Sequence, residues 1–133
     1  MKTPDEVRKE FVQEWVGKAN TDLKVAEYLL PEPEFVEVTC FHAQQAVEKF
    51  LKAILALKEI EIPKTHNLKV LLDLTGLSET ETGVKSDEMR ILNAYSVKAR
   101  YPLGKPMLNM DDAKKAVEIA KKMRDAICII LGI

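Results

Sequence analysis

The sequence is short of net charge, of cysteine and of long apolar runs. Its 20 basic residues face 21 acidic ones, which leaves a formal net charge of -1. This balance excludes the global basic field that would draw a chain onto nucleic acid or onto an anionic membrane. Binding of that kind therefore requires a local patch of suitable side chains.

The two cysteines, Cys40 and Cys128, are too few for a disulfide framework. Their apolar neighbours in the sequence indicate buried thiols instead. The first residues do not resemble a secretory signal, and no apolar run approaches the ~18 residues of a membrane span. We therefore expect a cytoplasmic protein with no membrane contact.

What the sequence does contain is apolar residues at helical spacing. They make up 47% of the 133 residues, enough for one domain, residues 1–133, with a real core. Strand signals are scarce, and apolar periods near 3.6 residues dominate. The sequence predicts an all-α fold, an up-and-down bundle of about five helices that opens with a long antiparallel helical hairpin.

Capping and proline signals mark the two helices of this hairpin. Thr3, Pro4 and Glu6 form a capping box with proline at the first helical position, and Pro31 ends the first helix. Its expected buried stripe consists of Phe11, Trp15, Ala19, Leu23, Ala26 and Leu30. The second helix is predicted over residues 35–57.

Three further helices are predicted after the hairpin. Thr65 is the expected cap of a short helix over residues 67–74, and residues 78–85 are expected to form a loop. The fourth helix begins at Ser86 and ends near Arg100, because the following proline disfavours helix. Asn109 caps the last helix, which ends in an apolar run over residues 126–131.

The second predicted helix carries polar residues on one side. Projected at 100° per residue, its Gln45, Glu48, Lys49 and Lys52 lie together. One interpretation is a solvated face on which Glu48 and Lys52 form a pair contributing ~0.3 kcal/mol. The other is a set of donors for a phosphate or a partner protein. Spacing alone favours the solvated face.

Four other residues are candidates for chemistry. His42 lies at the edge of the polar face and is expected to be satisfied by a neighbouring helix. His66 lies at or inside the first turn of the short helix, whose free N–H groups favour anions, although it could equally help to cap the turn. Arg100 could bind a phosphate and Tyr101 could stack on a base, or both could serve only the fold. No metal-ligand cluster is apparent, and we expect no cofactor.

Three segments together resemble the HEPN domains (higher eukaryotes and prokaryotes nucleotide-binding). They are Gln45-Ala46-x-Glu48-Lys49-x-x-Lys52, Thr65-His66-Asn67-Leu68 and Arg100-Tyr101-Pro102. The resemblance covers residues from about 7 to 131, nearly the whole chain. It implies a bundle of four or five helices that pairs as a homodimer, often with a cleft at the interface.

One part of the family's pattern is absent. Many HEPN domains are ribonucleases whose activity depends on an Arg-x(4–6)-His motif, yet no histidine follows Arg90 or Arg100. Histidine suits RNA cleavage because it can move the 2′-hydroxyl proton near neutral pH, and its loss removes much of a ~10²–10⁴-fold contribution. The resemblance therefore implies the non-nucleolytic branch, whose members are thought to bind nucleotides or a minimal nucleotidyltransferase partner in a toxin–antitoxin-like pair.

We thus predict a non-catalytic, homodimeric HEPN module that binds a nucleotide or RNA, such a nucleotidyltransferase partner, or both. Arg100 would contact phosphate, Tyr101 would stack or hydrogen-bond, and His66 would add a donor, with Lys49 and Lys52 as weaker candidates. Two alternatives stay open. One is a metal-independent ribonuclease in which His66 works beside Arg100; the other is a purely structural homodimeric interaction protein that uses the apolar run at residues 126–131.

Overall fold

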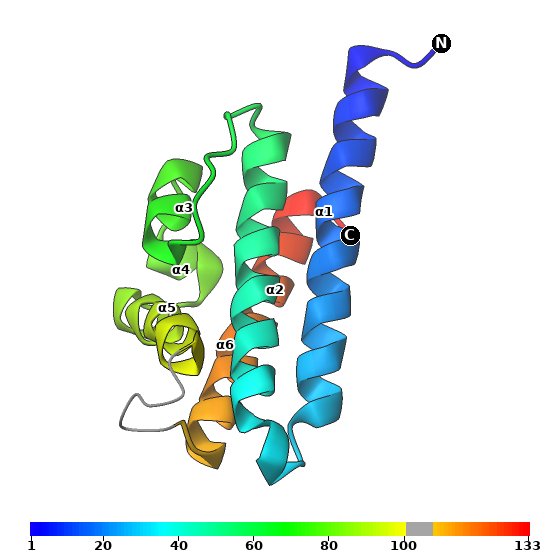
Figure 1. The fold of residues 1–133 in the computed structure, drawn as a ribbon. Coiled ribbons are helices and arrows are strands. Elements are labelled where there is room, and N and C mark those ends of the chain that lie inside the picture. The colour runs from blue at the N-terminus through cyan, green and yellow to red at the C-terminus, as the bar shows by residue number, and fades with distance from the viewer. Residues whose placement is uncertain (101–107) are drawn as a thin grey trace.

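The computed structural model describes residues 1–100 and 108–133, with side chains described for 1–95 and 108–133. These residues form helices and no strand. In order they are α1 (Pro4–Leu29), the 3-10 helix η1 (Pro33–Phe35), α2 (Val36–Leu57), α3 (Leu68–Thr75), α4 (Glu79–Thr82), α5 (Ser86–Arg100) and α6 (Met110–Leu131). Helices α1 and α2 form a long antiparallel hairpin (Figure 1). The predicted all-α bundle is confirmed.

Helix α2 is the centre of the bundle. It packs against α1, against α6, and against α3 and α5 (Figure 1). Phe50, Leu51 and Ile54 are fully buried, and burial of side chains of this size stabilises the fold by about 1.5–3 kcal/mol each. With neighbours on so many sides, α2 has little room for the solvated face that the sequence predicted. Glu48 and Lys52 are only 3% and 9% exposed.

Helix α1 begins where predicted, and the Thr3 hydroxyl accepts a hydrogen bond from the N–H of Glu6 at 3.2 Å, which is one of the two hydrogen bonds of the predicted capping box. Its buried face differs from the predicted one. Val12 and Val16 are buried, whereas Phe11, expected in the core, is 46% exposed. The cause is that α1 contacts both α2 and α6, so its buried face is turned toward both helices and leaves Phe11 at the edge.

Helix α3 starts one residue later than predicted and has a different cap. The side chain of Asn67 accepts hydrogen bonds from the N–H groups of Lys69 and Val70. Thr65 instead accepts from the N–H of Asn67 at 3.1 Å. The helix ends at Gly76, whose positive φ of 73° suits a residue without a Cβ.

Helices α5 and α6 begin near their predicted positions, and two short elements, η1 and α4, were not predicted. The expected loop over residues 78–85 contains the single turn α4, which begins with a reciprocal capping box between Ser78 and Glu81. Asn109 caps α6 as predicted, again in a capping box, with Asp112. Near the end of α6, Ile127 is buried but Ile129 is 80% exposed, so the apolar run contributes to the core on one side only.

Within the described residues, no helix combines the length and the apolar character that crossing a membrane requires.

Candidate functional site

Two carboxylates organise the polar side of α2, and Asp22 of α1 is the first. Its Oδ1 lies 2.9 Å from Nδ1 of His42, and its Oδ2 lies 2.5 Å from Nζ of Lys49. The Asp22 side chain is only 12% exposed. The prediction that a neighbouring helix satisfies His42 is confirmed, and α1 supplies the partner.

Glu48 of α2 is the second carboxylate, and it repeats this pattern. Its Oε1 lies 2.9 Å from Nδ1 of His66, and its Oε2 lies 3.1 Å from Nζ of Lys52. The Glu48 side chain is 4% exposed. The Lys52 ammonium also lies 5.5 Å from the ring centroid of Trp15, within range of a cation–π contact. We call Asp22, His42, Glu48, Lys49, Lys52 and His66 the ion-pair seam.

The ion-pair seam changes what the two lysines can offer. Lys49 and Lys52 were predicted as donors to a ligand, but each ammonium is bound to a buried carboxylate, and the side chains are 24% and 11% exposed. Removing either lysine would take away the ammonium that balances the charge of a buried carboxylate, and its histidine would be the carboxylate's remaining partner in the seam. Their part in ligand binding stays a prediction, and their present contacts hold other residues in place.

The turn at residues 65–67 is held between α2 and α5. The side chain of Gln44 donates to the carbonyl of His66 at 3.4 Å. On the other side, the Asn93 side chain of α5 accepts from the N–H of Leu68 at 3.0 Å and donates to Asn67 at 3.1 Å. His66 is thus held by its main chain and by its ring, while 65% of its side chain faces solvent.

The start of α3 does not offer free N–H groups to an anion, contrary to the expectation from the sequence. The N–H of Leu68 donates to Asn93, and the next two N–H groups donate to the side chain of Asn67. A ligand at this turn would therefore be recognised by side chains. Among these, His66 is well exposed.

Arg100 and Tyr101, the other two predicted site residues, are only partly placed. Arg100 is the last residue of α5, but its side chain and the whole of Tyr101 lie outside the described part of the chain. The helical repeat puts position 100 two turns beyond Asn93, on the same side of α5 and about 10 Å along its axis. Since Asn93 contacts the 65–67 turn, α5 leads from that turn toward Arg100.

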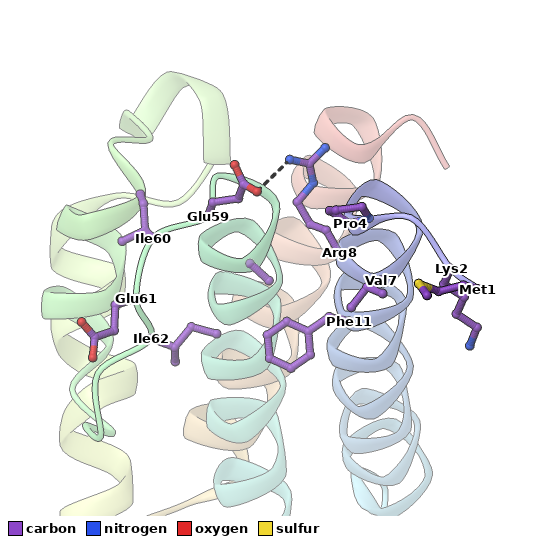
Figure 2. A pocket seen from close by; sticks show the side chains of 11 residues that line it. Met1, Lys2, Pro4, Val7, Arg8, Phe11, Glu59, Ile60, Glu61 and Ile62 are labelled. Atoms are coloured by element: carbon purple, nitrogen blue, oxygen red, sulfur yellow. Dashed lines mark ion pairs between the residues drawn. The ribbon is translucent and has the colours of Figure 1, made fainter.

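The sequence did not predict an open apolar pocket at the start of α1. Figure 2 shows it between α1 and the segment after α2, with an ion pair between Arg8 and Glu59, 3.2 Å apart, at its rim. Its apolar lining includes Pro4, Val7, Phe11, Ala56, Ile60 and Ile62. Phe11 was predicted to be a core residue, so its place in an exposed apolar surface was not expected. Among described side chains, those predicted to bind a ligand do not line it.

The other chemical candidates are inert or structural. Burial, with the nearby Asp112 and Glu37 charges, raises the pKa of the Cys40 thiol to about 12, so at neutral pH it is not the thiolate that a nucleophile requires. Burial and the hydrogen bond to Asp112 likewise raise the pKa of Tyr95. The described side chains contain no group of three histidines, cysteines or carboxylates arranged to hold a metal ion.

Comparison with known proteins identifies one family by its profile. The HEPN domain profile matches residues 12–130. Among solved structures, the chain is similar to the crystal structure of an archaeal HEPN homologue, with a TM-score of 0.66 and 22% sequence identity over 90% of this chain and 97% of that one. No curated protein matches the chain. At this identity, the structural likeness shows a shared helical fold.

Proposed function

Because the chain belongs to the HEPN domain family, we propose that it is a non-catalytic member that binds a nucleotide, a minimal nucleotidyltransferase partner, or both. In this proposal the chain is a single domain that acts as a homodimer in the cytoplasm. It forms one half of a toxin–antitoxin-like pair.

The observation that carries the proposal is where the two histidines lie. No histidine follows Arg90 or Arg100, so the sequence lacks the Arg-x(4–6)-His motif. His42 is bound to Asp22 with its side chain 28% exposed. Cleavage of RNA without a metal needs a group that moves the 2′-hydroxyl proton. The motif's own source of that group is missing, which favours binding over cleavage.

The binding region that we propose lies along α5. His66 is exposed on the turn beside Asn93, and α5 continues from there to Arg100, which Tyr101 follows. A nucleotide could place its phosphate at Arg100 and its base on Tyr101, with a third contact at His66. Lys49 and Lys52 would support this region indirectly, through their ion pairs with Asp22 and Glu48 in the ion-pair seam.

The open apolar pocket supports the protein-partner part of the proposal. Val7 and Phe11 are 53% and 46% exposed, and they lie beside Ile60 and Ile62. Exposed apolar groups gathered in this way commonly mark sites of interaction with another protein.

Isothermal titration tests the proposal with ATP, GTP and a short RNA at fixed salt. We expect saturable nucleotide binding that Arg100→Ala weakens by about 10-fold or more, as expected for a lost charge-assisted contact. Arg90→Ala is the matched control, because Arg90 is exposed and pairs with Asp87 on the surface of α5. If Arg100→Ala leaves the affinity for nucleotides and for the partner unchanged, the assigned role of Arg100 is wrong.

One observation favours a second candidate, a metal-independent ribonuclease that uses Arg100 with His66. The exposed His66 ring is held through Nδ1 by the buried Glu48 carboxylate, an arrangement that orients a histidine for proton transfer. A gel assay for RNA cleavage separates the two candidates. Cleavage that disappears in His66→Ala would replace the binding proposal, whereas intact RNA would exclude the ribonuclease.

A further inference from the structure

Two residues of α2, one helical turn apart, hold two different atoms of His66. Gln44 binds the main-chain carbonyl of His66, and Glu48, four residues later, binds its ring nitrogen Nδ1. Because both contacts come from one rigid helix, the ring has a set position and a set orientation. The exposed part of the ring is therefore presented to solvent in a defined way.

Glu48 can only accept hydrogen bonds in this setting. Its second oxygen lies 3.1 Å from the ammonium of Lys52, which supplies a positive charge beside a carboxylate that is 4% exposed. The Lys52 ammonium also makes a cation–π contact with the Trp15 ring, 5.5 Å from its centroid. An ionised carboxylate is an acceptor alone, so the proton in the hydrogen bond belongs to Nδ1 of His66.

The protonated Nδ1 determines the role of the other ring nitrogen. In a neutral imidazole one nitrogen is a donor and the other an acceptor. We propose that Glu48 is a positioning residue that keeps neutral His66 protonated on Nδ1, so that Nε2 accepts a hydrogen bond from a hydroxyl or amino group of the bound nucleotide. This inference rests on the proposed nucleotide-binding function. It assigns His66 to the sugar or the base, in place of the donor role expected from the sequence.

The ion-pair seam contains its own control. Asp22 binds a histidine through Nδ1 and a lysine, as Glu48 does, but the histidine is His42. Asp22→Asn therefore disturbs a carboxylate of the same kind without touching His66. A general loosening of the bundle would affect the two variants alike, whereas a positioning role confines the effect on His66 to Glu48→Gln.

The tautomer is measured by NMR of the imidazole nitrogens in 15N-labelled, ligand-free protein, at about pH 8, where an ordinary histidine is neutral. We expect His66 to carry its proton on Nδ1 in the natural protein, to lose this preference in Glu48→Gln and to keep it in Asp22→Asn. A natural His66 protonated on Nε2 overturns the inference. That spectrum needs no variant, so a poorly folded variant does not affect this test.

Titrations then identify the group that His66 meets. We expect Glu48→Gln to weaken the binding of ATP by about 10-fold, while inorganic triphosphate binds with unchanged affinity. Loss of the effect with 2′-deoxy-ATP would indicate the sugar hydroxyl, and loss with inosine triphosphate the base amino group. Equal weakening of ATP and inorganic triphosphate would place phosphate at His66 and overturn the assignment. If none of them binds the natural protein, the proposed nucleotide function fails, and the ligand assignment with it, whereas the NMR result still decides whether Glu48 sets the tautomer.

Discussion

Oδ1 of Asp22 in α1 lies 2.9 Å from Nδ1 of His42 in α2, and Oε1 of Glu48 lies at the same distance from Nδ1 of His66. In both pairs the carboxylate meets Nδ1 of the ring, and its second oxygen meets a lysine of α2. The first pair ties α2 to α1, and the second ties α2 to the 65–67 turn. The polar side of α2 thus joins elements that are distant in the sequence.

Asp22→Asn should lower the free energy of unfolding by about 2–4 kcal/mol. The change leaves the partly buried Lys49 ammonium without its counter-charge, and the loss of one partner of such a pair is costly. Urea denaturation measures the effect. The control is Glu14→Gln, which removes an exposed pair with Lys18, 3.9 Å long, and should cost less than about 1 kcal/mol. Equal effects would mean that burial of the Asp22 pair adds nothing.

Asn67→Ala should lower stability by about 1–2 kcal/mol, because it removes the cap of α3 and the contact with Asn93. Thr65→Ala is the matched comparison, since the Thr65 hydroxyl accepts a hydrogen bond from the N–H of Asn67 within the same turn. Thermal unfolding of the two variants should rank Asn67→Ala as the less stable. The reverse order would indicate that Thr65 caps α3, as the sequence predicted.

Glu88 should contribute to acid stability. Burial acts to raise its pKa, but the N–H of Lys85 and the ammoniums of Lys115 and Lys122 outweigh it and lower the pKa from 4.5 to about 2. The charged form is thus favoured in the folded state. Its contribution, about 2 kcal/mol, is complete above about pH 4.5 and is lost as the pH falls toward about 2.

Urea denaturation of the natural protein and of Glu88→Gln at several pH values tests this dependence. The difference in unfolding free energy should be constant at neutral pH and should shrink between about pH 4.5 and 2. Glu118→Gln serves as the control, because Glu118 also pairs with Lys122 but is 56% exposed. A difference that does not change with pH would contradict the role of the Glu88 charge.

Cys40 should resist alkylation in the folded protein. Its thiol is buried, and its pKa of about 12 leaves almost no thiolate at about pH 8. Cys128 is only partly buried, so iodoacetamide should modify it first. Mass spectrometry of digested protein measures both rates, and urea should equalise them. Rapid labelling of Cys40 without denaturant would show that the centre of α2 opens readily.

Local signals in the sequence predicted the helices well. Thr3 and Asn109 cap α1 and α6 as expected, because capping depends on residues within one turn of each other. The same kind of signal gave the wrong cap for α3, because Thr65 and Asn67, two residues apart, are both capping residues. Asn67 is the cap, and it is also bound by Asn93 of α5, a contact that the sequence does not show. The single turn α4 was missed because a stretch of polar residues resembles a loop.

The ion-pair seam could not be predicted from the spacing of residues on α2. The helical projection correctly put Glu48, Lys49 and Lys52 on one side, but it did not show that Asp22 and His66 lie against that side. Whether a polar face meets water or buried partners is decided by other parts of the chain. The partners come from α1 and from the turn before α3, 27 and 18 residues away. This is why a surface predicted to be solvated is largely buried.

The central place of α2 has a consequence for how the chain acquires its structure during synthesis. Helices α1 and α2 are made first and are neighbours in sequence, so their hairpin can form early. The side of α2 that packs on α6 stays uncovered until α6 has been made, after every other helix described. A growing chain therefore carries an uncovered apolar surface from the completion of α2 until α6 has been made, the condition under which nascent proteins aggregate or recruit chaperones.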